Sequence, residues 1–110
     1  DRMSDGMRQI EDAIELNPDN PLPYERLAGI YRMLGRNKDA IEAYDQAIRI
    51  KPTNATLRFS RGRLLADEGK GAEALADLKI ALPLSRPETT LHRAIVELIE
   101  TLSRRQKTSP

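Results

Sequence analysis

Several residue types are absent or rare in this sequence, and each shortage removes a class of function. There is no cysteine and no tryptophan, and phenylalanine and histidine each occur once. Without cysteine the chain has no disulfides and no thiolate metal sites. The single histidine, His92, has no second histidine or cysteine with which to share a metal ion, so we interpret it as structural. Long apolar runs are also missing: none approaches the ~20 residues of a membrane-spanning helix, and we expect no membrane span.

An excess of charge of one sign is lacking as well. The chain has 18 Lys and Arg against 17 Asp and Glu, for a formal net charge of +1 at pH 7. A nearly neutral chain offers no bulk field that would favour nucleic acid or a membrane surface. Arg58, Arg61 and Arg63 form a basic cluster, but aromatic side chains that stack on bases are few. We therefore do not expect nucleic acid as a partner.

No constellation of side chains indicates catalysis. The carboxylates are numerous but scattered, as expected for solvated helix faces. Residues 67–71 look superficially like a glycine-rich phosphate loop, but they lack the GxxxxGK[ST] spacing and a preceding strand. We therefore predict that the chain is not an enzyme, and we expect no catalytic residue, no cofactor and no metal ion.

The sequence does contain a repeat with a period of 34 residues. Three sets of matching positions recur at this period: Gly6, Ala40 and Ala74; Ile10, Tyr44 and Leu78; and Ala13, Ala47 and Ala81. A fixed period in the range of about 20–50 residues indicates a solenoid, in which each unit buries its apolar face only against its neighbours. The small residues are expected where helices cross closely, because a larger side chain would push the helix axes apart.

The central unit resembles the tetratricopeptide repeat family. The family pattern is an aromatic residue, Leu-small-x-x-Tyr, Ala-x-x-x-aromatic and Pro, and it appears here as Tyr24, Leu27, Ala28, Tyr31, Ala40, Tyr44 and Pro52. The following unit is a weaker copy, with Arg58 and Arg61 at the positions of Tyr24 and Leu27. The resemblance covers nearly the whole chain and implies paired helices that stack in a right-handed solenoid.

The repeat boundaries predict one domain over residues 1–104 and a disordered tail over residues 105–110. The expected parts are a partial repeat (1–20), two full repeats (21–54 and 55–88) and a C-terminal helix (87–104). The fold class is therefore all-α, with about five helices forming two full repeats flanked by half-units. Because the chain begins at Asp1, inside a repeat, we expect it to be a piece of a longer protein.

The resemblance also implies a binding surface, because the first helix of each pair lines the concave side of such a solenoid. Six residues form the predicted peptide-binding groove: Arg26, Gly29, Met33, Phe59, Arg63 and Arg93. Phe59 is the most informative of them, since an aromatic side chain with an arginine one turn further along the helix is typical of an interaction hot spot. The alternative is that Phe59 only fills space between helices.

We therefore predict a non-enzymatic protein-interaction module that binds a peptide or a helix of a partner in this groove. One subset of the family grips the terminal carboxylate of chaperone tails with Lys and Asn, but the corresponding positions here hold Glu25, Gly29, Ser60, Thr90 and Ala94. Two alternatives stay open. One is a self-assembling scaffold that forms a homo-oligomer through its end helices. The other is a docking or regulatory segment of a larger enzyme.

Overall fold

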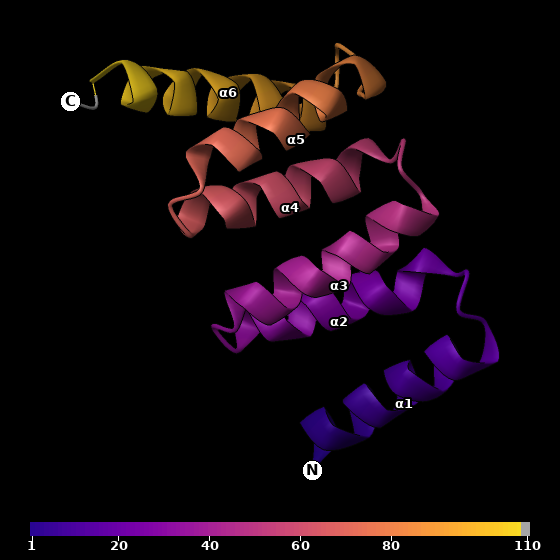
Figure 1. Cartoon of the computed structure of the whole chain (residues 1–110). Helices are drawn as coiled ribbons and strands as arrows, with labels where there is room; N and C mark the ends of the chain where they lie inside the picture. Colours follow the sequence, from indigo (N-terminus) through magenta and orange to yellow (C-terminus); the bar gives the residue numbers. More distant parts are fainter. Residues whose placement is uncertain (109–110) are drawn as a thin grey trace. The chain divides into compact units, whose positions relative to one another are not determined.

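The computed structural model describes residues 1–108, and every regular element in that range is a helix (Figure 1). The helices are α1 (Arg2–Leu16), α2 (Pro21–Met33), α3 (Asn37–Ile50), α4 (Ala55–Asp67), α5 (Gly71–Leu84) and α6 (Thr90–Thr108). The chain forms two compact units: residues 1–52 contain α1 to α3, and the part from Thr53 onward contains α4 to α6. The expected all-α class of helix-turn-helix pairs is confirmed, with six helices against the expected about five.

Side-chain caps fix where three of the helices begin. The Asn20 side chain accepts a hydrogen bond from the Leu22 N–H (3.1 Å) at the start of α2. Asn54 does the same for the Leu57 N–H (3.1 Å) at the start of α4. Each bond satisfies one of the backbone donors that a helix start leaves without an intrahelical partner. At α1 the cap is Asp1, whose side chain accepts a hydrogen bond from the N–H of Ser4 (2.8 Å).

The second helix of each pair begins directly after a tight turn and has no side-chain cap. Arg36 occupies the cap position of α3, and Lys70 occupies that of α5. The turns contain Gly35 (φ 74°) and Gly69 (φ 78°), which adopt the left-handed conformation that ends the preceding helix. Glycine has no Cβ and takes this conformation at little cost, so both turns are specified by the sequence.

In the first unit α2 packs against both α3 and α1. The small residues of the repeat lie in these contacts: Ala28, Ala40 and Ala47 each have 0% exposed surface. Tyr44 is 6% exposed, as expected for a side chain wedged between helices. Tyr24 and Tyr31 are only half-buried. Small residues at the crossings allow the helix axes to approach closely, which is the reason that the repeat conserves their size from one unit to the next.

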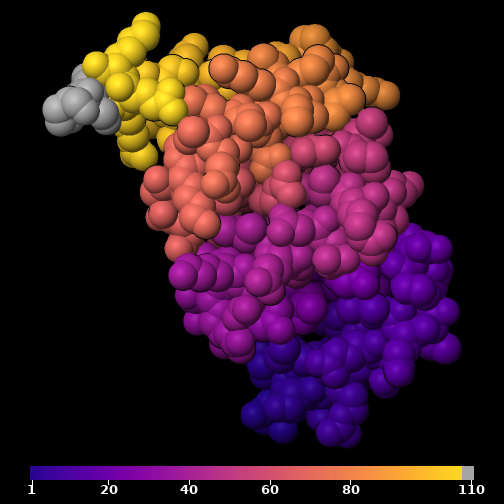
Figure 2. Space-filling view, viewed as in Figure 1, coloured from indigo at the N-terminus to yellow at the C-terminus, as the bar shows by residue number. Residues whose placement is uncertain are grey.

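In the second unit α4 pairs with α5, and α6 packs on both of them (Figure 1). The closest approach is at Gly62, where an added Cβ would stand 3.3 Å from the Leu78 side chain. The core side of α6 is marked by Ile95 (0% exposed) and Leu102 (3%). Figure 2 shows α6, in yellow, lying directly against the orange α5. The last helix therefore covers the helix pair of this unit.

Pro83 lies within the last turn of α5, which ends one residue later at Leu84. The last helix differs from expectation at both of its ends. The last helix starts at Thr90 instead of residue 87, and its first turn is held by the Thr89 side chain, which accepts from the His92 N–H (3.2 Å). It then continues to Thr108, past the expected end at 104, because no glycine or proline interrupts it. Residues 109–110 of the expected tail lie outside the described residues.

Candidate functional site

Three of the predicted groove residues share one exposed face of α2. Arg26, Gly29 and Met33 follow at helical spacing, and with Leu22 they fall within roughly 60° of the helix circumference. Arg26 is exposed, Met33 is 78% exposed and Leu22 is 53% exposed. Ala28, on the opposite side, is fully buried. We call these four residues, Leu22, Arg26, Gly29 and Met33, the α2 strip; it combines apolar surface with one cation.

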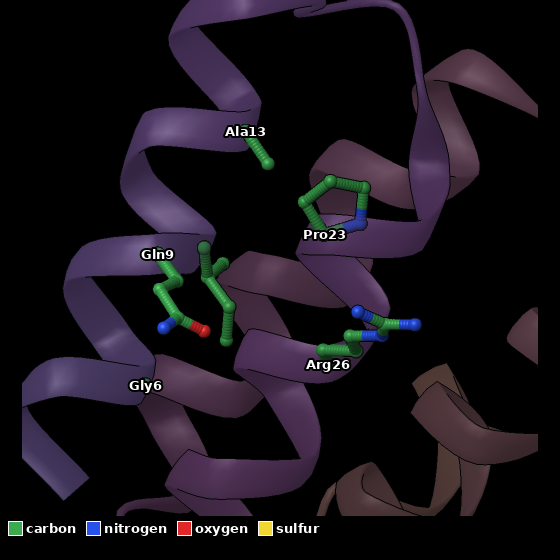
Figure 3. Close-up of a pocket in the computed structure, with 6 residues that line it drawn as sticks. Gly6, Gln9, Ala13, Pro23 and Arg26 are labelled. Carbon is green, nitrogen blue, oxygen red and sulfur yellow. The ribbon is translucent and has the colours of Figure 1, made fainter. Parts of the chain in front are cut away.

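Arg26 also lines a hollow between α1 and α2 (Figure 3). This hollow has a volume of about 250 Å³ and is lined by Gly6, Gln9, Ile10, Ala13, Pro23 and Arg26. Ala13 and Pro23 point toward one another across it. Gly6 and Ala13 occupy the repeat positions of Ala40 and Ala47 of α3, both of which are fully buried. The face of α1 at the hollow is therefore of the kind that a helix covers in the next repeat.

In the second unit α4 carries Phe59 and Arg63, and the two side chains are in contact. The Arg63 guanidinium carbon lies 5.6 Å from the centroid of the Phe59 ring, within the range of a cation–π interaction. Phe59 is half-buried and Arg63 is exposed. Leu57 and Leu64, which are buried, lie on the other side of α4. The pair therefore forms a partly exposed aromatic surface with a cation stacked on it.

Arg93, the last of the predicted residues, is exposed near the start of α6. Within residues 1–108 no ion pair or ring contact joins it to Phe59 or Arg63. The six predicted residues thus comprise three on α2, a contacting pair on α4 and a separate arginine on α6. Their use as one groove stays a prediction.

The sequence analysis missed a cluster of buried charge on α4 and α5. Asp77 is 3% exposed, and its two carboxylate oxygens accept hydrogen bonds from Arg61 at 2.7 Å (Nε) and 2.6 Å (Nη2). Arg58 adds a third contact at 3.3 Å. Arg58 and Arg61 therefore do not form, with Arg63, the basic surface cluster that the sequence suggested. The available signal was the repeat itself, which aligns Asp77 with the small residue Ala43.

The single histidine has a structural role, as predicted. His92 Nδ1 lies 2.8 Å from the hydroxyl oxygen of Ser85, and that hydroxyl donates to the Leu82 carbonyl (2.8 Å). Because the Ser85 hydroxyl directs its only proton at the Leu82 carbonyl, the hydrogen between Ser85 and His92 belongs to Nδ1, and His92 Nδ1–H donates to the Ser85 oxygen. Ser85 is 9% exposed, so the histidine satisfies a nearly buried oxygen where the chain leaves α5. This contact joins the end of α5 to the first turn of α6.

Within the described part of the chain, no three His, Asp or Glu side chains gather closely enough to hold a metal ion. None of the helices over residues 1–108 is both long and apolar enough to cross a membrane.

The paired helices, the glycine turns and the buried small residues define a class of helical repeat, and two family models match it. One, described as TPR repeat, matches residues 28–69, and the other, described as Tetratricopeptide repeat, matches residues 10–42. Together they span residues 10–69, more than half of the 110-residue chain. The chain belongs to the tetratricopeptide repeat family.

Among curated proteins, the chain is similar to the human DnaJ homolog subfamily C member 3. The two are 30% identical over 100 residues, which are 91% of this chain and 20% of that protein. A peroxisomal targeting signal receptor of Candida albicans is 28% identical over 97 residues, which are 88% of this chain and 15% of that protein. The chain therefore spans about a fifth or less of the length of these relatives.

Solved structures show the same fold. The TPR domain of P58(IPK) superposes with a TM-score of 0.85 at 26% identity, over 96% of this chain and 29% of that one. The Yersinia enterocolitica type III secretion chaperone SycD, in complex with a peptide of the translocator YopD, gives a TM-score of 0.86 at 17% identity, over 96% of this chain and 82% of that one. At 17% identity the second match speaks for the fold alone.

Proposed function

We propose that this chain is a non-enzymatic protein-interaction module that binds a peptide segment of a partner protein. The observation that carries the proposal is the Phe59–Arg63 pair, a partly exposed ring with a guanidinium stacked on it. Aromatic and arginine side chains dominate the energetics of protein interfaces. The family supports the proposal, because tetratricopeptide repeats typically act as interaction modules, and so does the SycD neighbour, whose structure contains a translocator peptide.

The chemistry of the predicted groove residues suggests what such a peptide contains. Met33 and Phe59 offer apolar surface, and Arg26, Arg63 and Arg93 offer three positive charges. An extended segment with an apolar side chain for the Phe59 ring and a carboxylate for the adjacent Arg63 would satisfy both features. Neighbouring Glu25, Asp67 and Glu97 limit any preference for a purely acidic ligand.

The experiment starts from peptides selected on the wild-type chain from a random display library. Their dissociation constants are then measured by fluorescence anisotropy for Phe59→Ala and Arg63→Glu. The matched controls are Ile80→Ala and Lys79→Glu. They likewise truncate a large apolar side chain and reverse a positive charge, at exposed positions of α5 in the same unit. We expect each groove variant to weaken binding at least about tenfold, as hot-spot truncation does, and the controls to leave it unchanged. Equal affinities for groove and control variants would remove the groove assignment.

A second candidate function, self-association, is favoured by the hollow between α1 and α2. Its α1 side presents a small-residue face whose equivalent on α3 is fully buried, and the hollow has a volume of about 250 Å³. A helix of a second copy is the occupant that this alternative requires. Light scattering on wild type and on Ala13→Glu tests it: self-association predicts an oligomer that the substitution dissociates. A wild-type chain that stays monomeric at high concentration would argue against this alternative.

A further inference from the structure

A second hollow in the first unit lies between α2 and α3. It has a volume of about 240 Å³ and is lined by Tyr24, Leu27, Tyr31, Asp39, Glu42, Ala43 and Gln46. We call it the tyrosine hollow. Its α2 residues lie about 160° around that helix from the α2 strip, counted at 3.6 residues per turn. It is therefore a different surface from the one used in the proposed function.

The lining of the tyrosine hollow suits a cation. Two tyrosine rings, Tyr24 and Tyr31, come from α2, and two carboxylates, Asp39 and Glu42, come from α3. No lysine or arginine is among the seven lining residues. The face of an aromatic ring carries negative electrostatic potential, so rings and carboxylates together attract positive charge.

One edge of the tyrosine hollow already holds a guanidinium group of the chain itself. The Arg36 guanidinium carbon lies 5.0 Å from the centroid of the Tyr31 ring, and Arg36 pairs with Asp39 at 2.7 Å. Tyr24 and Glu42 offer the same two kinds of group elsewhere in the lining, one from each helix. Glu42 is exposed and has no ion pair within residues 1–108. A second cation can therefore lie against Tyr24 and Glu42, as Arg36 lies against Tyr31 and Asp39.

The second repeat shows what this part of a helix pair accommodates. A shift of 34 residues carries Tyr24, Leu27 and Ala43 onto Arg58, Arg61 and Asp77. In α4 and α5 those positions hold two guanidinium groups against one carboxylate, with the contacts at 2.6–3.3 Å. In the second unit this part of the helix pair is filled by arginine side chains of the chain itself, and in the first unit it is hollow.

We infer that the tyrosine hollow binds an arginine side chain of a partner protein, seated between the Tyr24 ring and the Glu42 carboxylate. Arginine suits it better than lysine, because a planar guanidinium stacks on a ring and gives two parallel hydrogen bonds to a carboxylate. The site gives the chain a second binding surface, which works independently of the groove residues.

The test is a titration of the ¹⁵N-labelled chain, followed by amide chemical shifts. The probe is the capped tripeptide Gly-Arg-Gly, and its control is the same peptide with citrulline, which keeps the shape of arginine and lacks its charge. We expect saturable shifts confined to α2 and α3 around the hollow, and at least about tenfold weaker binding of the citrulline peptide. Glu42→Gln should weaken binding by about fivefold, the effect of one exposed charge pair. Glu15→Gln, an exposed carboxylate of α1, should leave it unchanged.

Three results would overturn the inference: equal binding of the citrulline peptide, no effect of Glu42→Gln, or shifts spread over acidic positions along the chain. A titration of Phe59→Ala separates this site from the proposed groove. Arginine binding that survives in this variant supports a second surface, and binding lost with Phe59 contradicts it. Failure of the groove proposal would leave the arginine titration as predicted.

Discussion

Replacing Asp77 with alanine tests how the second unit holds two arginines in its helix pair. Asp77 is 3% exposed and accepts hydrogen bonds from Arg61 through both carboxylate oxygens. The side chains of Arg58 and Arg61 are 17% and 20% exposed, so both guanidinium groups are largely removed from water. The substitution removes the carboxylate that balances them and leaves the arginines in place.

The structure indicates the size of the effect. Removing one partner of a buried ion pair costs ~3–5 kcal/mol, because the other charge stays buried without it. The partial exposure of both arginines allows some rehydration, so we expect the lower end, ~3 kcal/mol. That is a large fraction of the ~5–15 kcal/mol that stabilises a typical domain.

The first repeat supplies a matched control. The triple substitution Arg58→Tyr, Arg61→Leu, Asp77→Ala installs the residues found at the same positions of the first unit. Replacing a whole buried ion cluster with well-packed apolar residues is often neutral or stabilising. We therefore expect the triple variant to recover part of the stability that Asp77→Ala loses, because it removes the buried charges, although the same three residues line a hollow in the first unit.

Urea denaturation followed by far-UV circular dichroism measures both changes, with the slope of the transition compared between variants. A loss below ~1 kcal/mol for Asp77→Ala would refute the reasoning, since exposed ion pairs contribute no more than that. A triple variant no more stable than Asp77→Ala would also refute it, because the loss would then come from packing and not from the charges.

Three further substitutions, two of them with a matched control variant, test the packing and the helix ends by the same denaturation assay. Gly29→Ala meets nothing within 4 Å and should stabilise α2 by up to ~1 kcal/mol, whereas Gly62→Ala places a Cβ 3.3 Å from Leu78 and should be less favourable than Gly29→Ala by ~1–3 kcal/mol because of overpacking; equal effects would contradict the crowding at Gly62. Tyr44→Ala empties a position that is 6% exposed and should cost ~3–5 kcal/mol, and a change under ~1 kcal/mol would show that the ring is dispensable to the core. Asn54→Ala removes the cap of α4 and should cost ~1 kcal/mol, while Asn54→Asp, which keeps an accepting oxygen, should lose little.

The architecture follows from the sequence because its determinants are local or periodic. Gly35 and Gly69 end α2 and α4 through their own conformational freedom, without help from distant residues. Ala40 and Ala74, and likewise Ala47 and Ala81, are fully buried, as their recurrence at 34-residue spacing predicts. Positions that must be small or left-handed carry that requirement in their residue type.

The features that sequence reasoning missed depend on contacts between side chains far apart in the chain. Arg58 and Arg61 reach Asp77 across 19 and 16 residues, and neither composition nor charge counting reveals that they pair. The contact between Arg63 and Phe59, in contrast, is predictable from the sequence, because the two residues are four apart on one helix. The extension of α6 to Thr108 was missed because a polar composition was read as disorder, although the segment contains no helix breaker before Pro110.

The Arg58–Arg61–Asp77 cluster also has a consequence for the folding of a chain whose helices have similar sequences. Repeat proteins risk exchanging equivalent helices, either within a chain or between chains. If α4 took the place of α2 against α3, two guanidinium groups would meet Ala43 in place of the buried Asp77. The carboxylates nearby are Glu42, which is exposed, and Asp39, which is already paired with Arg36. If α2 took the place of α4, Asp77 would lose both of its arginines. We infer that the cluster favours the pairing of α4 with α5 over its exchange with another helix pair during folding. A triple variant that refolds without any added domain-swapped dimer on size-exclusion chromatography would show that the helices are kept apart by other means.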